Sequence, residues 1–192
     1  MSNFASDPEG PFLQQHLKKI DGKNGVVLYE VSQEPLRQEV ISYDFLRHID
    51  AARITMPAAL PDRSNQEYRM KLAIGDDSRY VLLSFPAGQV EYSLTVPERA
   101  ALRFAIGRQF PPCDSPGTFA VEIRTPDGAT HLLYQRELWA GNTQDAAGWN
   151  EEEISLEPYA NQPVRLTFRN SYGGGEVCNR FLWADPVIVV RP

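Results

Sequence analysis

Apolar and polar residues alternate along most of the chain after residue 80, which is the period of a strand with one buried face. The alternation is clear in "RYVLLSFP", "QVEYSLTVP" and "ALRFAIG", and it returns in "TFAVEIRT" and "PVRLTFRN". Turn-forming stretches such as "FPAG", "TPDG" and "NSYGGG" separate these runs. The pattern predicts an all-β fold of about eight short strands, an antiparallel β-sandwich or jelly roll.

One turn fixes the pairing of two of these strands. The "PDG" sequence lies between two strand-like runs, so Arg124 to Thr130 is predicted to be a hairpin connection. The pattern argues against a parallel doubly wound sheet, because such a sheet needs crossover helices and no helical period lies between the runs.

The first 79 residues have a different pattern. The apolar spacing in "PFLQQHLKKI" predicts a short amphipathic helix that ends near Gly22, and "GVVLYEV" predicts a strand. The segment "YDFLRHIDAARI" predicts one or two helical turns, and "MPAALPDRSNQEY" has the composition of an exposed linker. We therefore predict a small N-terminal α/β appendage and linker over residues 1–79, followed by a jelly-roll domain over residues 80–192.

Size and charge exclude some functions. The chain has 192 residues, of which 42% are apolar, enough for one substantial core. A net charge of −6 and the lack of any basic run argue against nucleic-acid binding. No apolar run is long enough to insert into a membrane, and the start "MSNFASDPEGPF" does not resemble a signal peptide. Two expectations stay open: a cytoplasmic protein, or an extracytoplasmic segment of a longer chain.

The two cysteines, Cys113 and Cys178, lie in the Pro- and Gly-rich stretches "FPPCDSPG" and "GGGEVCNR". They are too few for a four-ligand zinc site and do not form a C-x-x-C pair. A disulfide between them would close a loop of about 65 residues and contribute about 4 kcal/mol in the chain-entropy model. A Cys113–Cys178 disulfide and two free thiols are the two interpretations.

Catalytic motifs are missing from the sequence. It contains no G-x-S-x-G and no H-E-x-x-H, and its histidines are isolated. The acidic residues Glu151, Glu152 and Glu153 are consecutive, so on a strand they cannot all face one substrate, and they are interpreted as the solvated start of a strand. The triple glycine at 173–175 lacks the Lys-Ser/Thr of a phosphate loop. We predict no catalytic residue, no metal ligand and no cofactor.

Aromatic residues in loops suggest another chemistry. Sugars bind by stacking their C–H faces on exposed rings, while polar side chains bond the hydroxyl groups. Trp139 lies in the polar loop "RELWAGNTQDAAGW", and Tyr172 precedes the triple glycine. The predicted carbohydrate-binding residues are these two rings together with Asn142, Asp145 and Arg180.

The order of the motifs over about residues 70 to 190 resembles galactose-binding-like jelly-roll domains. The resemblance is carried by "VPERAALRFAIG", "GWNEEEISLEPYANQPVRLTFRN" and "NRFLWADPVIVV". It places Trp149 and Trp183 at packing positions and identifies a fold rather than a reaction.

Similar domains occur on the extracytoplasmic side of bacterial polytopic membrane glycosyltransferases and polysaccharide-assembly proteins. The stretch "GVVLYEVSQEPLRQEVI" is similar to the strand that precedes such domains. The resemblance implies a periplasmic or cell-surface accessory domain of a membrane protein, with a carbohydrate or polysaccharide as its partner. Some relatives bind a structural Ca²⁺. Asn179 stands where the family often has Asp and supplies no charge, so the resemblance gives calcium little support.

Two functions from different classes follow. The first is non-catalytic recognition of a carbohydrate by the loops at one end of the sandwich. The alternative is a structural or protein-interaction domain with no sugar ligand, which an exposed apolar patch on one sheet face would favour.

Overall fold

The protein divides into two compact units, Met1–Val40 with Arg191–Pro192, and Ile41–Val190. Each unit is considered by itself. Side chains are not described for residues 17–31, 108, 109, 172 and 180. The computed structural model describes residues 17–23, 26–31, 39–56, 64–84, 87–109, 116–138, 148–172 and 180–191.

The N-terminal unit contains an antiparallel hairpin of β1 (Leu17–Lys23) and β2 (Val26–Val31). The predicted strand "GVVLYEV" is therefore confirmed. The predicted helix is wrong over residues 17–20, which belong to β1, and its first part lies outside the described residues. The helical spacing of the apolar residues in this segment covers too few turns to hold a helix alone. Pairing with β2, which is rich in valine, satisfies the backbone of β1 instead.

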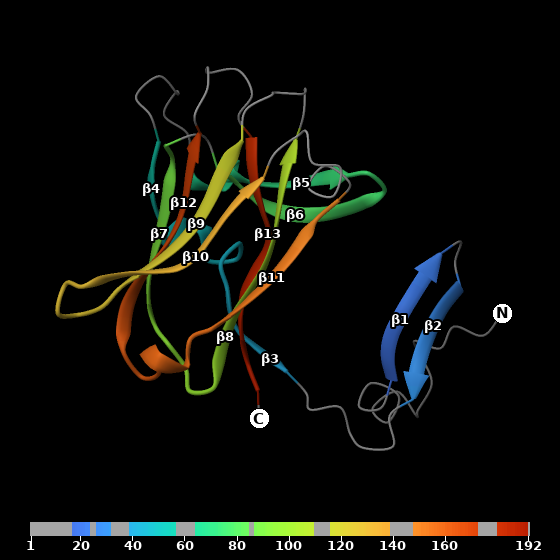
Figure 1. Ribbon diagram of the computed structural model, residues 1–192, viewed down its shortest axis with the longest axis horizontal. Coiled ribbons are helices and arrows are strands. Elements are labelled where there is room, and N and C mark those ends of the chain that lie inside the picture. Colours follow the sequence, from blue (N-terminus) through green and yellow to red (C-terminus); the bar gives the residue numbers. More distant parts are fainter. Residues whose placement is uncertain are drawn as a thin grey trace. The chain divides into compact units, whose positions relative to one another are not determined.

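The larger unit is a sandwich of two antiparallel sheets (Figure 1), as the alternation predicted. One sheet has the order β10, β9, β12, β7, β4, with bounds Thr130–Leu138, Gly117–Arg124, Pro163–Tyr172, Gln89–Thr95 and Arg53–Thr55. The other has the order β11, β8, β13, β6, β5, and β3 also pairs with β13. Their bounds are Asn150–Ser155, Ala100–Gln109, Arg180–Val190, Asp77–Ser84, Arg69–Ile74 and, for β3, Val40–Asp44.

Short 3₁₀ turns are the helical elements of the described chain: η2 (Ile49–Ala51), η3 (Asn65–Tyr68) and η4 (Glu157–Tyr159). The segment predicted to hold one or two helical turns thus contains a single 3₁₀ turn. The structure describes no helix with the length and apolar character needed to cross a bilayer.

The sandwich begins earlier in the chain than the predicted boundary. Strands β4 and β5 are members of the two sheets, and Phe45 and Ile49 are fully buried in the core. A boundary after residue 79 falls inside β6, so residues 41–79 are part of the sandwich rather than of an appendage. Strands of three to six residues give too little alternation to be recognised from sequence.

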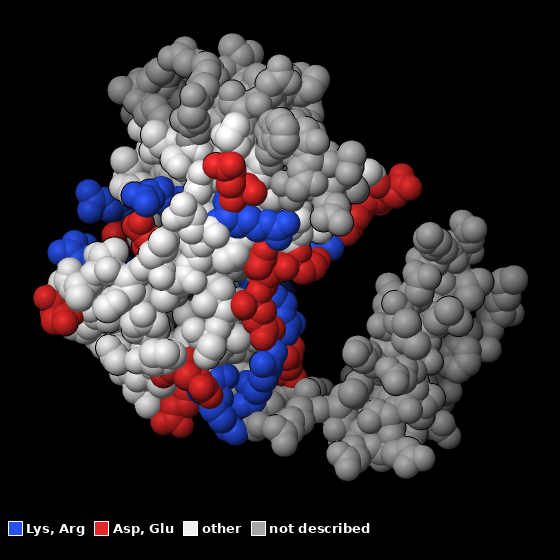
Figure 2. Space-filling model, in the orientation of Figure 1, with Lys and Arg blue, Asp and Glu red and all other residues white. Residues whose placement is uncertain are grey.

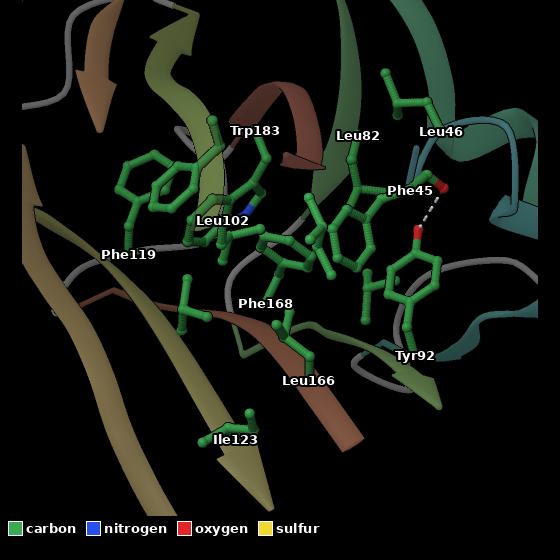
Figure 3. Close-up of a cluster of buried hydrophobic side chains, with 14 of the residues drawn as sticks. Phe45, Leu46, Leu82, Tyr92, Leu102, Phe119, Ile123, Leu166, Phe168 and Trp183 are labelled. Carbon is green, nitrogen blue, oxygen red and sulfur yellow. Dashed lines mark hydrogen bonds between the residues drawn. The ribbon is translucent and has the colours of Figure 1, made fainter. Parts of the chain in front are cut away.

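The core between the sheets is built around Trp183 on β13. Its ring packs edge-on against Phe168 at 5.0 Å, Phe119 at 5.1 Å and Phe104 at 5.3 Å between ring centroids. Its indole Nε1 donates a hydrogen bond of 3.0 Å to Asn170 Oδ1. Figure 3 shows Trp183 among residues of both sheets. The packing position that the resemblance implied for Trp183 is confirmed.

A second aromatic group ties the segment after β3 to the core. The Tyr92 hydroxyl on β7 donates a hydrogen bond of 3.1 Å to the Phe45 carbonyl oxygen, drawn as a dashed line in Figure 3. Burial raises the pKa of Tyr92, with smaller contributions from Tyr43 and Asp44. The hydroxyl therefore stays a proton donor, and the aromatic contact between Phe45 and Tyr92 at 4.9 Å closes this side of the core.

The outer face of the six-stranded sheet carries a second apolar cluster. Gly107 on β8 lets the β5 side chain Ile74 and the Trp149 ring approach the backbone, because a Cβ atom there would overlap Ile74 Cδ1 and lie 2.9 Å from Trp149 Cε3. The cluster is capped by β5, so part of this face is closed to solvent. Its buried members are Val81, Leu83, Ala105, Leu182 and Ala184, with Met70, Leu72, Ile74 and Trp149 packed against them.

Candidate functional site

A groove of about 560 Å³ lies on the five-stranded sheet, where β7 ends, β12 begins and the turn from β9 to β10 folds over. We call it the Arg124–Arg165 groove. Its lining residues are Ser93, Leu94, Thr95, Arg124, Thr125, Pro126, Gly128, Pro163, Val164 and Arg165.

The groove follows from the alternation of the strands. Ile123, Leu166 and Tyr92 point into the core, so their neighbours along each strand face outward. In the antiparallel register Arg165 is paired with Arg124 on one side and with Ser93 on the other. These three outward residues form one row across β9, β12 and β7, about 10 Å from end to end at the usual strand spacing.

The charge of this row is poorly neutralised. The Arg165 Nη1 atom lies 3.8 Å from Glu91 Oε1, beyond hydrogen-bond distance. Within the described ranges the side chain of Arg124, which is exposed, forms no hydrogen bond or ion pair. Arg169, further along β12 on the same face, instead forms an ion pair of 2.7 Å with Glu122. Two arginines are therefore direct cross-strand neighbours, and their guanidinium groups have donors left for a ligand.

A rigid turn forms one wall of the groove. The Gly128 amide donates to the Thr125 carbonyl oxygen at 2.9 Å, and Gly128 has a φ of 89° that favours glycine. The Asp127 carboxylate accepts hydrogen bonds from the Thr125 hydroxyl and, at 3.1 Å, from the Ala129 amide. These bonds, the one from Thr125 first, lower the pKa of Asp127. The carboxylate is thus engaged within the turn.

The strand ends next to several of the predicted carbohydrate-binding residues lie at the other end of the sandwich. Tyr172 is the last residue of β12 and pairs with Gly117, which pairs with Leu138, the residue before Trp139. Arg180 is the first residue of β13 and pairs with Gln109. The strand ends next to these residues thus lie at one end of the sheets (Figure 1). Trp139, Asn142, Asp145, Cys113, Cys178 and the position Asn179 lie outside the described residues, as do the side chains of Tyr172 and Arg180.

The binding assignment and the disulfide therefore stay predictions. The backbone places positions 138 and 172 in one cross-strand row, because each of them pairs with Gly117, from opposite sides of β9.

The three consecutive glutamates are divided among three arginines. Glu151 pairs with Arg79, and Glu153 pairs with Arg103, on the outer face of the six-stranded sheet. Figure 2 shows acidic and basic side chains next to one another along the region of β8 and β11. In the part of the chain that the structure describes, no three His, Cys, Asp or Glu side chains lie close enough together to hold a metal ion.

Glu152 faces the other way, toward β10. Its Oε1 accepts hydrogen bonds from the Tyr134 hydroxyl at 2.8 Å and from Arg136 Nη1 at 2.7 Å. Burial, followed by the bond to Glu152, raises the pKa of Tyr134. These hydrogen bonds join β11 and β10, the edge strands of the two sheets. Glu152 therefore has structural partners, and it does not face a second carboxylate as the catalytic acids of a glycosidase do.

Trp149 packs at the rim, as the resemblance implied. Its indole Nε1 donates a hydrogen bond of 3.0 Å to the Asp77 carbonyl oxygen, and the Arg79 guanidinium lies 5.6 Å from the ring centroid. The ring is held against the second apolar cluster. It is therefore engaged in packing and not presented as a free stacking surface.

Comparison with solved structures shows a shared β-sandwich fold of the kind found in carbohydrate-binding modules. The carbohydrate-binding module TmCBM61, solved in complex with β-1,4-galactotriose, has a TM-score of 0.50 and 10% identity over 79% of this chain and 100% of its own. The K3 cleaved adhesin domain of Lys-gingipain from Porphyromonas gingivalis has a TM-score of 0.52 and 16% identity over 79% of this chain and 99% of its own. No family model and no curated protein matches the sequence.

The sequence reasoning missed the Arg124–Arg165 groove. A signal was present: Arg165 and Arg169 occupy outward positions in "PVRLTFRN", and Arg124 directly precedes the "TPDG" turn. These residues meet only through the strand register, which alternation alone does not supply.

Proposed function

We propose that this domain recognises a carbohydrate chain and carries out no catalysis itself. The observation that carries the proposal is the Arg124–Arg165 groove, a polar depression whose hydrogen-bonding side chains come from neighbouring strands. Carbohydrate recognition needs a few fixed polar groups beside apolar surface, and the fold is one that TmCBM61 also has.

The groove offers both kinds of contact. The guanidinium groups of Arg124 and Arg165 donate to sugar hydroxyl oxygens, and the Ser93 hydroxyl donates or accepts. Pro126 and Pro163 supply apolar surface for the C–H groups of a ring. The lining contains no aromatic ring, so hydrogen bonding rather than stacking dominates at this site.

The loop end is proposed as a second contact region. There Trp139 stacks on a sugar ring, Tyr172 forms a second platform, and Asn142, Asp145 and Arg180 bond the hydroxyl groups. The support for this part is the residue types in the sequence and the neighbouring strand ends at positions 138 and 172.

Calorimetric titration and a glycan array test the function. We expect saturable binding of at least one oligosaccharide by the full chain. The variant Arg124→Ala/Arg165→Ala should weaken it, while Arg169→Ala, on the same sheet face but paired with Glu122, should not. Trp139→Ala tests the loop end separately. Absence of any saturable glycan binding contradicts the function, and binding that neither variant weakens contradicts both site assignments.

We further propose that the domain is an extracytoplasmic part of a bacterial membrane-associated glycan-handling protein. The support is the resemblance to accessory domains of such proteins. In an oxidising compartment Cys113 and Cys178 are expected to be paired. A thiol assay on the protein from its natural source, denatured without a reducing agent, should therefore find no free thiol. Titration of two thiols counts against this location.

The alternative function is a structural or protein-interaction domain without a sugar ligand. It requires an apolar patch on one sheet face. Four large apolar side chains are exposed in the described part of the chain: Val40, Ile41, Tyr80 and Leu132. Leu132 is on β10 of the five-stranded sheet and the others are on β3 and β6 beside β13, so the four do not form a single patch, which favours the carbohydrate proposal.

A further inference from the structure

We propose that the Arg124–Arg165 groove selects an acidic saccharide, one whose sugar rings carry carboxylate groups as uronic acids do. The inference rests on the proposed function, since it names the ligand class for the same site. It comes from the charge and register of the groove rather than from the fold.

The first argument is the pairing of like charges. Arg124 and Arg165 are direct cross-strand partners on β9 and β12, and both face outward. Like charges directly opposite each other destabilise a sheet. No acidic residue lines the groove, and the nearest carboxylate contact of Arg165, with Glu91, is 3.8 Å long. An anion between the two guanidinium groups removes this repulsion.

The second argument is that several other arginines of the sandwich form close ion pairs. Arg169, Arg103 and Arg136 each form an ion pair of 3.0 Å or less with a glutamate. The protein as a whole has a net charge of −6, so acidic partners are plentiful. Arg124 and Arg165 are adjacent and have no carboxylate within hydrogen-bond distance, so they form a local excess of positive charge in a groove that also contains hydroxyl groups.

The third argument is geometric. A guanidinium is a planar fork that binds a carboxylate through two parallel hydrogen bonds. Two forks one strand spacing apart, about 5 Å, present such donors to the same or successive acidic groups. Ser93, at the end of the row, adds a hydroxyl for a neighbouring sugar oxygen. The row can therefore bind carboxylate groups at its arginines and a hydroxyl group of the same saccharide at Ser93.

The size of the groove favours a saccharide over a small ion. Its volume of about 560 Å³ greatly exceeds the roughly 30 Å³ occupied by one water molecule in the liquid. A bare inorganic anion would contact the two arginines and leave Pro126, Pro163 and Thr95 without a partner. A ring bearing a carboxylate contacts both parts.

The test is calorimetry on the full chain with an α-1,4-linked oligogalacturonate, its carboxyl-reduced neutral form, a sulfated oligosaccharide of similar length, and inorganic sulfate. We expect the oligogalacturonate to bind at least about tenfold more tightly than the neutral form, because charge-assisted hydrogen bonds are lost on reduction. Added salt should weaken this binding.

The outcomes separate the two proposals. Equal binding of the neutral form overturns the acidic-saccharide inference and leaves carbohydrate recognition intact. Preference for the sulfated chain, or for sulfate alone, overturns the carboxylate assignment. Failure of every oligosaccharide, these and those of the glycan array, overturns the proposed function.

Matched variants locate the effect. Arg124→Gln and Arg165→Gln should each weaken oligogalacturonate binding about tenfold or more, and Arg169→Gln should leave it unchanged. Arg124→Lys keeps the charge and loses the fork, so it should recover only part of the affinity. Because Arg124 and Arg165 repel each other, Arg124→Gln should not lower the thermal midpoint. A clear fall in that midpoint shows that Arg124 is a structural residue and overturns the assignment.

Discussion

The two sheets of the sandwich have outer faces of opposite character. On the six-stranded sheet, β5 and Trp149 cap an apolar cluster that includes the fully buried Leu182. On the five-stranded sheet, the outward positions of β7, β9 and β12 carry mainly hydroxyl, guanidinium and carboxylate groups. Part of the first face is used for packing, and the second remains in contact with solvent.

This difference between the outer faces shows which sheet can carry a ligand site. The part of a face that is covered by its own hairpin gains stability but offers no surface to a partner. The uncovered face contributes to stability only through the inward half of its residues, so its outward half is free to carry the Arg124–Arg165 groove.

The largest expected effect comes from the same substitution made on each face. Leu182→Ala removes a side chain that is 0% exposed and should cost about 2 to 5 kcal/mol of unfolding free energy. Leu132→Ala removes one that is 54% exposed on the outer face of β10 and should change it by less than about 0.5 kcal/mol. Urea unfolding measures both. Similar costs for the two variants contradict the assigned contrast.

A smaller effect tests how closely the hairpin covers its face. Gly107→Ala places a Cβ against Ile74 Cδ1 and the Trp149 ring and should cost about 1 to 3 kcal/mol. The control is Gly148→Ala, next to Trp149, where a Cβ meets no atom within 4 Å. Thermal unfolding compares the pair. If Gly107→Ala is as stable as the control, β5 and Trp149 do not close over β8.

The smallest effect distinguishes two aspartates with opposite pKa shifts. Partial burial raises the pKa of Asp185, which lies in the β13 bulge at a φ of 44°. A raised carboxyl pKa favours the folded state at low pH, and this advantage is lost as pH rises through the folded value. Asp185→Asn keeps a side chain that tolerates this φ and should slightly raise stability at neutral pH.

The pKa of Asp127 is lowered by the bonds of its turn, so the sign is reversed. Its contribution is present above the unfolded pKa, near 3.8, and is lost as pH falls through the lower folded value. Asp127→Asn should therefore lower stability at neutral pH and lessen its decline in acid. Thermal midpoints of both variants are measured at neutral pH and near pH 3. If the two substitutions shift the midpoint at neutral pH in the same direction, the opposite pKa shifts assigned to Asp185 and Asp127 are contradicted.

The strands of the sandwich could be predicted where alternation is long. Val121 and Ile123, or Leu166 and Phe168, fix their strands because every second residue enters one core. The "PDG" turn correctly predicted the β9–β10 hairpin. The β13 ladder shifts between Ala184 and Val187, because Pro186 has no backbone N–H to donate to it.

Other features depend on tertiary structure and could not be predicted in this way. The alternation in "RMKLAI" is that of a strand, but its apolar side chains cover a sheet from outside, which local pattern does not reveal. Leu17 and Ile20 fit a helix and a strand equally, and the hairpin partner decides. Ser93, Arg124 and Arg165 are far apart in sequence, so only the register of three strands identifies them as one site.

The register of that row also affects the kinetics with which a ligand would bind. Its three residues are held by backbone ladders of neighbouring strands, so the backbone of the recognition surface is preorganised and exists whenever the sheet is folded. The ordering entropy lost on association then comes mainly from the side chains of Arg124 and Arg165. The observed association rate should rise linearly with ligand concentration in a single kinetic phase, as expected for a site that needs no conformational step before or after encounter.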